Sequence, residues 1–469
     1  MISNNNFKNG DCLMSKEMIE YITKLISIPS VSSDSTKKDH CLKTAEFVVS
    51  KLQELGAETK LVQNEVKGKN PLIYGRSGSD PNKKTILFYS HYDVQPALKE
   101  DGWETDPFTV VKKTADNNDE YLYGRGVTDD KGPIVVVYQA IKELQKEGDL
   151  PVNLRWLYEG EEESGSGGFE ETVGKDVSFF GKVDGLLIMD VGWAKEETPT
   201  VGFGTRGIVY AFIEIKGPAK DVHSGTGGSF REPMTDLVQI LSKLVDLDGK
   251  ILVEGVYDSV RPLTKEEEEI YENYPFDVEE FKRNIGYTTK WDNEDPKIII
   301  MNMWRYPSLT IHGIEGAFYG PGAKTVIPAK VIGKVSIRLV PDQKPKEIGE
   351  LFKKYVEKEF EKLHSPNKLN FEVPEGGDWW FGDPNTFLFE ANKKAIQEYW
   401  KKDPLFTRGG GSIPIIPFME KTFAAPAMCV ATGQPTDGGH SQNERIRIKN
   451  LIGSKEVVKL MLKNLSSIK

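Results

Sequence analysis

The sequence predicts an α/β protein in which a domain with a mostly parallel central sheet is interrupted by a smaller, inserted α+β domain. Short apolar runs of β-forming residues alternate with amphipathic helical runs before Gly202 and again after Asp383, an order typical of parallel sheets covered by helices. Between these regions the pattern changes to longer alternating strands. A length of 469 residues exceeds the ~100–200 residues of one domain, so we expect more than one. From the changes of pattern, we assign residues 1–205 and 384–469 to the first domain and residues 206–383 to the inserted one.

Apolar spacing predicts the elements of the two outer segments. Helical spacing ends before Pro29 in the first run, and Gly56 provides a C-cap for the second. Short continuous apolar runs predict buried strands. The predicted elements are helices at Met14–Ile28, Leu42–Leu55, Ile134–Lys146 and Asn385–Tyr399, strands at Thr85–Tyr89, Val152–Tyr158, Gly185–Met189 and Ala427–Thr432, and a last helix from Asn450.

The inserted segment has its own elements. Ile208–Lys216 and Val331–Val340 read as strands, and Pro233–Val245 and Lys346–Leu363 read as helices. Thr264–Glu294 is acidic and polar, so we expect an exposed helical insertion there and assign it no chemistry.

Composition excludes several functional classes. The formal net charge of -10 argues against broad binding to nucleic acid or anionic lipid. Cys12, Cys41 and Cys429 are odd in number and far apart, which fits neither a disulfide framework nor a CxxC site and favours a reducing compartment. The polar start of the sequence lacks a signal-peptide core, and apolar stretches such as Ile134–Val137 are too short to span a bilayer. We therefore expect a cytoplasmic protein without membrane contact.

Two motifs near the first strands offer metal ligands. In SHYDVQP, His91 and Asp93 follow a strand, so the histidine can bind a metal while the aspartate orients its ring; a surface pair without a role is the alternative. In YGRGVTDDKGP, Asp129 and Asp130 lie on a glycine-lined turn before a helix. A carboxylate there can bridge two cations, or it can be an ordinary N-cap.

Further acidic residues follow the next strands. The segment EGEEESGSGG packs four glutamates together at a strand end, where they repel one another unless cations neutralise them; a solvated charge run is the alternative. Neighbouring side chains on extended backbone point in opposite directions, so one glutamate can bind metal while the next acts as a base. Asp190 ends a strand, and His440 lies in TDGGHSQNE. Ligands after successive strands are typical of a site at the carboxyl edge of a sheet.

Eight blocks give the chain a resemblance to a known family. They are SHYDVQPA, LYGRGVTDDKGP, EGEEESGSGG, DVHSGTGGS, RYPSLTIHGIEGA, GAKTVIPAKVIGKVSIRLVP, GGGSIP and DGGHSQNE, in this order from about residue 20 to residue 465. Together they resemble the cytosolic non-specific dipeptidase and carnosinase group, within the wider two-metal aminoacylase and carboxypeptidase family of metallopeptidases. The resemblance implies a peptidase for dipeptides or very short peptides, with a catalytic α/β domain and an inserted lid and dimerisation domain.

The resemblance also implies roles for individual residues. Asp129 would bridge two divalent ions. Its partners would be Glu163 and His440 at one ion, and His91 and Asp190 at the other. Glu162 would be the general base, and Asp93 would be the partner behind the ligands that orients the ring of His91. Zinc suits this mixed ligand set, with manganese and cobalt as alternatives.

Residues of the inserted domain complete the implied site. His223 resembles a histidine that such homodimers offer to the active site of the neighbouring subunit. Arg338 resembles the residue that binds the terminal carboxylate of the substrate, and its place on the polar face of a strand agrees with this role. Thr325, Gly411 and Ser412 resemble the remaining substrate contacts. His312 matches a family block and is expected to be structural, whereas His40 and His364 match nothing and are expected to be exposed.

Three other functions are compatible with parts of the sequence. An N-acyl amino acid deacylase or a carboxypeptidase could use the same ligands. A non-catalytic dimeric binding protein is the alternative from another class, against which the intact ligand set argues. A serine hydrolase is disfavoured because the chain has no GxSxG motif.

Overall fold

The computed structural model describes residues 9–148, 150–290 and 294–468, and these fall into two compact units. The first unit contains the chain up to Phe203, Gly382–Thr407 and the chain from Ile415 onward, and the second contains Gly204–Phe381 and Arg408–Pro414. The main divisions lie within two residues of the predicted 205/206 and 383/384 positions. The short segment 408–414 belongs to the second unit, although the prediction placed it in the last part of the first domain.

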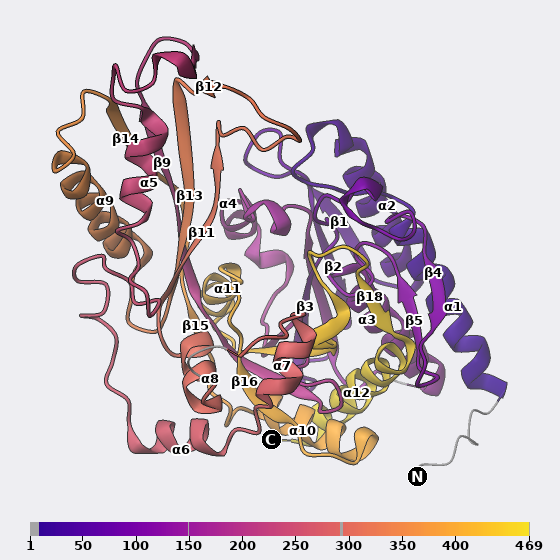
Figure 1. Cartoon of the computed structure of the whole chain (residues 1–469). Helices are drawn as coiled ribbons and strands as arrows, with labels where there is room; N and C mark the ends of the chain where they lie inside the picture. Colours follow the sequence, from indigo (N-terminus) through magenta and orange to yellow (C-terminus); the bar gives the residue numbers. More distant parts are fainter. Residues whose placement is uncertain (1–8, 149, 291–293, 469) are drawn as a thin grey trace. The chain divides into compact units, whose positions relative to one another are not determined.

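A nine-stranded mixed sheet forms the centre of the first unit (Figure 1). In spatial order its strands are β1 Glu58–Val62, β2 Leu72–Ser77, β6 Asn153–Glu159, β3 Thr85–His91, β7 Gly185–Gly192, β17 Ala427–Gly433, β8 Thr200–Thr205 and β15 Trp380–Phe381, with β16 Leu405–Arg408 also paired to β8. The four central strands β6, β3, β7 and β17 run parallel to one another. A separate small sheet joins β4 Val111–Thr114, β5 Glu120–Tyr123 and β18 Arg445–Arg447.

Helices cover both faces of the large sheet because alternate residues of its buried strands point to opposite sides. Ile86 and Phe88 of β3 join the core beneath the larger helical layer, in which α12 packs on α3. Tyr89 of β3 faces the other way, with its ring edge-on to Phe169. The larger layer contains α1 Asn9–Ile26, α2 Lys38–Glu54, α3 Lys131–Glu147, α10 Phe387–Trp400 and α12 Ile448–Ser467, and the opposite one contains α4 Phe169–Lys175 and α11 Ile415–Phe423.

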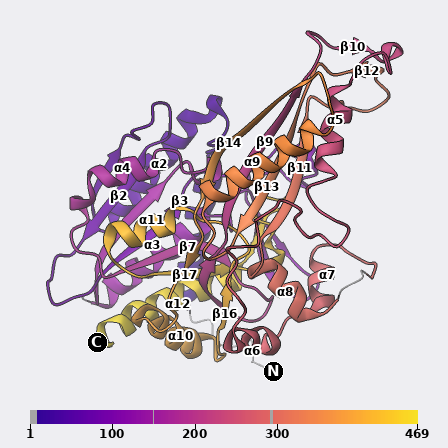
Figure 2. The same ribbon diagram turned by 90° about the vertical axis from the view of Figure 1, so that its left-hand side faces the viewer.

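The second unit has a four-stranded antiparallel sheet with helices on one face. Its strands in spatial order are β11 Ser308–Glu315, β13 Lys330–Leu339, β9 Gly207–Lys216 and β14 Lys368–Gly377. Figure 2 shows α5 (Pro233–Leu241) and α9 (Pro345–Glu361) lying along this sheet, and their apolar residues share one core with it. The remaining elements are the hairpin of β10 Val222–His223 with β12 Val326–Ile327, and helices α6 Lys265–Asn273, α7 Val278–Asn284 and α8 Pro296–Trp304.

The predicted α/β class is confirmed, with one difference in the sheet. Parallel pairing joins the four central strands, and β2, β1, β8 and β15 add antiparallel pairs on either side. The sequence did not reveal β1, because most of its residues are exposed and it has no apolar run. The predicted helical insertion at Thr264–Glu294 contains α6 and α7, and its residues 291–293 lie outside the described ranges.

Neither membrane spans nor disulfides are found in the described parts of the chain. No helix there is both long enough and apolar enough to cross a bilayer. Cys41 and Cys429 are free, buried thiols, and nothing is described of the Cys12 side chain. The buried thiols act as small apolar residues of the core.

Candidate active site

The four parallel strands bring the predicted ligands to one edge of the sheet. His91 is the last residue of β3, and Asp190 lies near the end of β7. Glu162 and Glu163 lie on the 3-10 turn η3 (Glu162–Ser164), which follows β6, and His440 lies on the loop beyond β17. Because parallel strands end at the same edge, ligands far apart in the sequence converge there.

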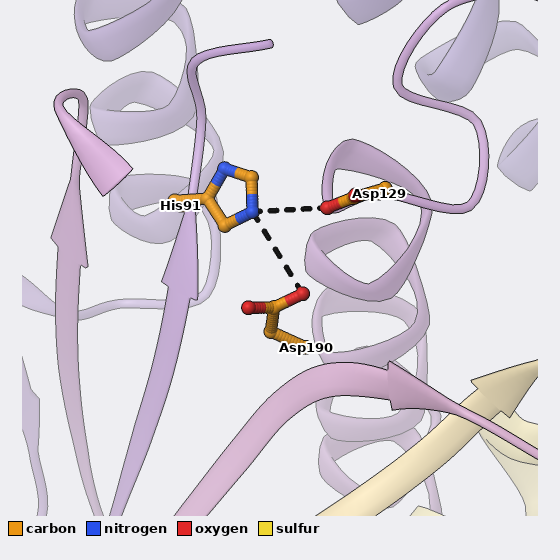
Figure 3. Close-up of side chains that lie close together, drawn as sticks. All are labelled: His91, Asp129 and Asp190. Carbon is orange, nitrogen blue, oxygen red and sulfur yellow. Dashed lines mark hydrogen bonds and ion pairs between the residues drawn. The ribbon is translucent and has the colours of Figure 1, made fainter. Parts of the chain in front are cut away.

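One cluster joins His91, Asp129 and Asp190 (Figure 3). His91 Nε2 lies 3.1 Å from Asp129 Oδ1 and 3.8 Å from Asp190 Oδ1, and both carboxylates point toward this nitrogen. The potential ligand atoms all lie within 4.8 Å of one another. This geometry suits one metal ion bound by two carboxylates and an imidazole.

A second cluster joins Asp129, Glu163 and His440. His440 Nε2 lies 3.0 Å from Asp129 Oδ2 and 3.0 Å from Glu163 Oε2. The two oxygens of Asp129 therefore serve different clusters: Oδ1 faces His91 and Oδ2 faces His440. A carboxylate shared in this way is the arrangement that a bridging ligand requires.

The two clusters bring several carboxylates together, and a positive charge beside them would be stabilised. Burial alone would raise the pKa of Asp129, but hydrogen bonds from His440 and His91 lower it below its usual value. Burial raises the pKa of Asp190 to about 6, with His91 opposing this shift. Hydrogen bonds to Asp129 and Glu163 raise the pKa of His440 to about 11. Positive charge beside these carboxylates is thus strongly favoured, which is the role that a divalent cation fills.

Glu162 lies beside the clusters without belonging to either of them. Its Oε2 is 3.9 Å from His91 Nε2. Burial is the main cause that raises the pKa of Glu162 well above its usual value, and the neighbouring carboxylates of Asp190 and Glu163 add to the shift. A glutamate that holds a proton more readily than usual, next to the ligands, has the property expected of a general base that must later return its proton.

Asp93 is fully buried behind His91 and connects two ligand segments. Its Oδ1 lies 3.4 Å from His91 Nδ1, and its backbone oxygen lies 3.2 Å from the same nitrogen. Its Oδ2 accepts a hydrogen bond from the backbone N–H of Glu163. Asp93 can therefore fix both the imidazole of His91 and the start of the Glu163 turn.

The remaining glutamates of the acidic segment have structural partners. Glu159 accepts hydrogen bonds from the hydroxyls of Tyr89 and Ser166. Glu161 accepts from Lys69 and from the backbone and side chain of Asn70. The four glutamates thus divide into two that hold the loop and two, Glu162 and Glu163, that face the ligands.

Two residues that support the site, Glu444 and Gln95, were not found from the sequence. Glu444 is fully buried and accepts hydrogen bonds from the Arg125 guanidinium and from the backbone N–H groups of Gly126, Thr128 and Asp129. Gln95 donates a 2.8 Å hydrogen bond to Glu163 Oε2. The position of Glu444 in the same motif as His440 was a possible signal, but its backbone contacts become visible only in the folded chain.

Asp130 does not act as the side-chain N-cap that the alternative interpretation suggested. It occupies the cap position of α3, but its side chain makes no cap hydrogen bond. Its Oδ2 instead accepts from the backbone N–H of His91 at 3.1 Å. The peptide bond between Asp129 and Asp130 is cis.

In the second unit, the structure brings His223 and Thr325 together. The two lie at the paired strands β10 and β12, with Thr325 Oγ1 3.4 Å from His223 Nε2. His223 is exposed, and its Nδ1 accepts a hydrogen bond from the backbone N–H of Gly225 at 2.9 Å. Because Nδ1 is an acceptor, the neutral ring carries its proton on Nε2 and can donate it to an oxygen.

Arg338 and Ser412 form another pair in the second unit. Arg338 Nη1 donates to Ser412 Oγ at 2.5 Å. Gly411, the residue before Ser412, accepts a hydrogen bond at its backbone oxygen from the N–H of Arg206. Burial lowers the pKa of Arg338 from its usual value, so an anion beside it would be stabilising.

The three other histidines lie outside these groups. His312 stacks on Tyr210 and its Nε2 lies 2.8 Å from Ser336 Oγ, as suits a structural residue. His364 is exposed as predicted. His40 is only partly exposed, and its buried Nδ1 has no hydrogen-bond partner within the described residues, so the expectation that it lies at a solvent-exposed position is wrong.

Comparison with known proteins shows similarity over nearly the whole chain. A profile of peptidase family M20/M25/M40 matches residues 87–464. A Cys-Gly metallodipeptidase of Candida albicans is 46% identical over 449 residues, covering 93% of this chain and 92% of the relative. The structures of a dipeptidase of Saccharomyces cerevisiae and of human carnosine dipeptidase 1 match with TM-scores of 0.92 and 0.91, at 40% and 37% identity, and each comparison covers 97% of both chains. The resemblance indicated by the sequence motifs is confirmed.

Proposed function

The chain belongs to peptidase family M20/M25/M40, and on that premise we propose that it hydrolyses dipeptides or very short peptides with two divalent metal ions. The observation that carries this proposal is the carboxylate of Asp129, whose two oxygens face His91 and His440 separately. Its other support is the similarity to dipeptidases over more than nine tenths of the chain.

The donor atoms present fit two divalent ions. Asp129 and Asp190 with His91 would hold one ion, and Asp129 and Glu163 with His440 would hold the other. Mixed imidazole and carboxylate ligands suit zinc, and they also accommodate manganese or cobalt. We propose zinc as the native metal.

When bound, two such ions supply a water of lowered pKa and polarise the substrate carbonyl. Glu162 would take a proton from this water and deliver it to the departing amine. The raised pKa of Glu162 suits this exchange, because a carboxylate with the usual value would hold the proton too weakly at neutral pH. Asp93 would keep His91 in one orientation throughout, through its contacts at Nδ1.

Residues of the second unit would recognise the substrate. Arg338 suits the terminal carboxylate because its guanidinium offers a planar fork of donors. His223 would donate its Nε2 proton to the oxygen that becomes negative during attack, since its Nδ1 is occupied by Gly225. Thr325, Gly411 and Ser412 would provide the remaining contacts.

We propose that the protein is a cytoplasmic homodimer in which His223 completes the neighbouring active site. The second unit exposes apolar side chains that a second copy could cover: Val238 of α5, Ile311 of the edge strand β11, and Phe318 are 49%, 42% and 48% exposed. The exposed position of His223 also suits a role in another subunit. Mixing a His223→Ala variant with an Asp129→Asn variant should restore part of the activity, and no restoration would contradict the shared site.

A substrate panel with and without a chelator tests the function. We expect metal-dependent hydrolysis of dipeptides such as Cys-Gly and β-Ala-His. N-acetyl and N-succinyl amino acids should react far more slowly. Preference for these acylated compounds would instead identify a deacylase, release of single C-terminal residues from longer peptides would identify a carboxypeptidase, and absence of both metal and activity would revive the binding-protein alternative.

A further inference from the structure

The glycines of segment 408–414 form backbone hydrogen bonds with other residues of the second unit. Gly409 donates a backbone hydrogen bond to Gly204 at 2.6 Å, and the N–H of Arg206 donates to Gly411 at 2.8 Å. A Cβ atom at Gly410 would meet the Met303 carbonyl oxygen at 3.3 Å. The backbone of this segment therefore runs close to the residues that precede β9.

The side chain of Arg206 joins this segment to the sheet. Its Nε donates to the Gly410 carbonyl at 2.9 Å, and its Nη1 donates to Ser308 Oγ at 2.9 Å. Ser308 lies directly opposite Arg338 in the pairing of β11 with β13, and these strands lie side by side in Figure 2. Arg206 thus connects Gly410 of the glycine segment with Ser308, the residue paired with Arg338.

The guanidinium groups of Arg206 and Arg338 lie close enough for their charges to interact. Throughout the described ranges, neither Arg206 nor Arg338 has a carboxylate within ion-pair distance. Burial, followed by the charge of Arg338, lowers the pKa of Arg206 to about 10. Two partly buried cations of this kind would be stabilised by an anion from outside the chain.

We propose that Arg206 is a positioning residue for carboxylate recognition: by fixing Gly410 and Gly411, it holds the Ser412 hydroxyl where it orients Arg338. This inference rests on the proposed dipeptidase function. Arg206 uses its own donors on Gly410 and Ser308, whereas Arg338 reaches Ser412 through Nη1. The remaining N–H groups of Arg338 are then held in one direction for the terminal carboxylate of a peptide.

The substitution Arg206→Lys would keep the positive charge but remove the planar guanidinium and its several N–H donors. An ammonium group at the end of a flexible chain cannot reproduce the Nε bond to Gly410 together with the Nη1 bond to Ser308. The variant Arg206→Lys therefore separates positioning from charge alone. If charge alone mattered, this variant would behave as the wild type.

The first test compares free dipeptides with their C-terminal amides in steady-state kinetics. Arg206→Lys and Arg338→Lys should each raise KM for free dipeptides by about tenfold or more, the loss expected for one charge-assisted hydrogen bond. Amides lack the carboxylate, so their kinetics should change little. The double variant should be no worse than the more damaged single variant by more than a few-fold, because both residues act on one interaction.

The matched control is Arg261→Lys, because Arg261 is an exposed arginine of the same unit whose guanidinium donates two hydrogen bonds to Asp342. It should leave KM unchanged for both substrate classes. Equal losses for dipeptides and amides in Arg206→Lys would overturn the inference, and so would kinetics like those of the wild type. A wild type that hydrolyses no dipeptide would instead contradict the proposed function itself.

Hydrogen exchange provides a readout that does not depend on activity. In Arg206→Lys, the amides of residues 408–414 should exchange faster than in the wild type, while those of β9 and β13 stay protected. Arg338→Lys should leave the glycine segment as protected as before, since Arg338 contacts only the Ser412 side chain there among the hydrogen bonds of the described residues. Unchanged exchange in Arg206→Lys would show that Arg206 does not hold the segment.

Discussion

Replacing Glu444 by glutamine tests how the loop of Asp129, the proposed bridging ligand, is held. The buried carboxylate of Glu444 accepts hydrogen bonds from the Arg125 guanidinium at 2.8 Å and from the N–H groups of Gly126, Thr128 and Asp129 at 2.9, 2.9 and 3.1 Å. Glutamine has the same shape but only one acceptor oxygen. Its NH₂ group would face N–H donors, and the Arg125 charge would lose its buried partner.

The expected magnitude follows from these contacts. Breaking a buried ion pair by removing one charge costs about 3–5 kcal/mol. Part of this free energy stabilises the native conformation of residues 126–129. In our proposal, that conformation is required before Asp129 can bridge two ions. Loss of a residue that orients a ligand lowers metal affinity by about 10- to 100-fold, and we expect Glu444→Gln to fall in this range.

Competition with a chromophoric chelator at pH 8 measures the effect on zinc affinity. The matched control is Glu104→Gln, which removes an exposed ion pair with Lys113 and should change stability little, because solvent screens such pairs. Zinc affinity of the control should equal that of the wild type. If Glu444→Gln binds zinc as tightly as Glu104→Gln does, the idea that Glu444 holds the bridging loop is refuted.

Three further predictions concern the metal clusters. Glu162→Gln should retain both metals and bind dipeptides while losing nearly all turnover, by about 10²-fold or more; normal turnover would exclude it as the base. Asp190→Asn should weaken one metal site selectively, so that elemental analysis finds about one ion per chain. The pKa of His440 is raised to about 11, so its ion pairs stabilise the metal-free protein fully below the usual value of 6.5 and lose this effect as pH rises through about 11. Metal binding at pH 8 must therefore displace a proton, and calorimetry in buffers of different ionisation enthalpy should detect its release; no release would contradict this assignment.

The ligands could be predicted from the sequence because each follows a feature that the sequence shows. His91 and Asp190 end apolar runs that form β3 and β7, and parallel strands end at a common edge. Asp129 stands on a glycine-lined turn before a strongly apolar helix. The sequence therefore predicted that these candidate ligands lie close together, and their assignment as ligands stays a prediction.

The supporting residues could not be predicted in the same way. Glu444 acts through backbone N–H groups more than 300 positions away in the chain, and sequence patterns carry no signal for such contacts. Arg206 likewise depends on carbonyl groups of a glycine segment, which have no side-chain signature. Patterns of residue types identify the groups that do chemistry better than the groups that hold them.

A zinc-soaked crystal measured at the zinc absorption edge tests the central claim most directly. We predict two anomalous peaks per chain, one beside Asp129 Oδ1 with His91 and Asp190, and one beside Asp129 Oδ2 with Glu163 and His440. Two peaks that share the Asp129 carboxylate would establish it as the bridge. A single peak, or two peaks of which one lies beyond reach of Asp129, would contradict the account.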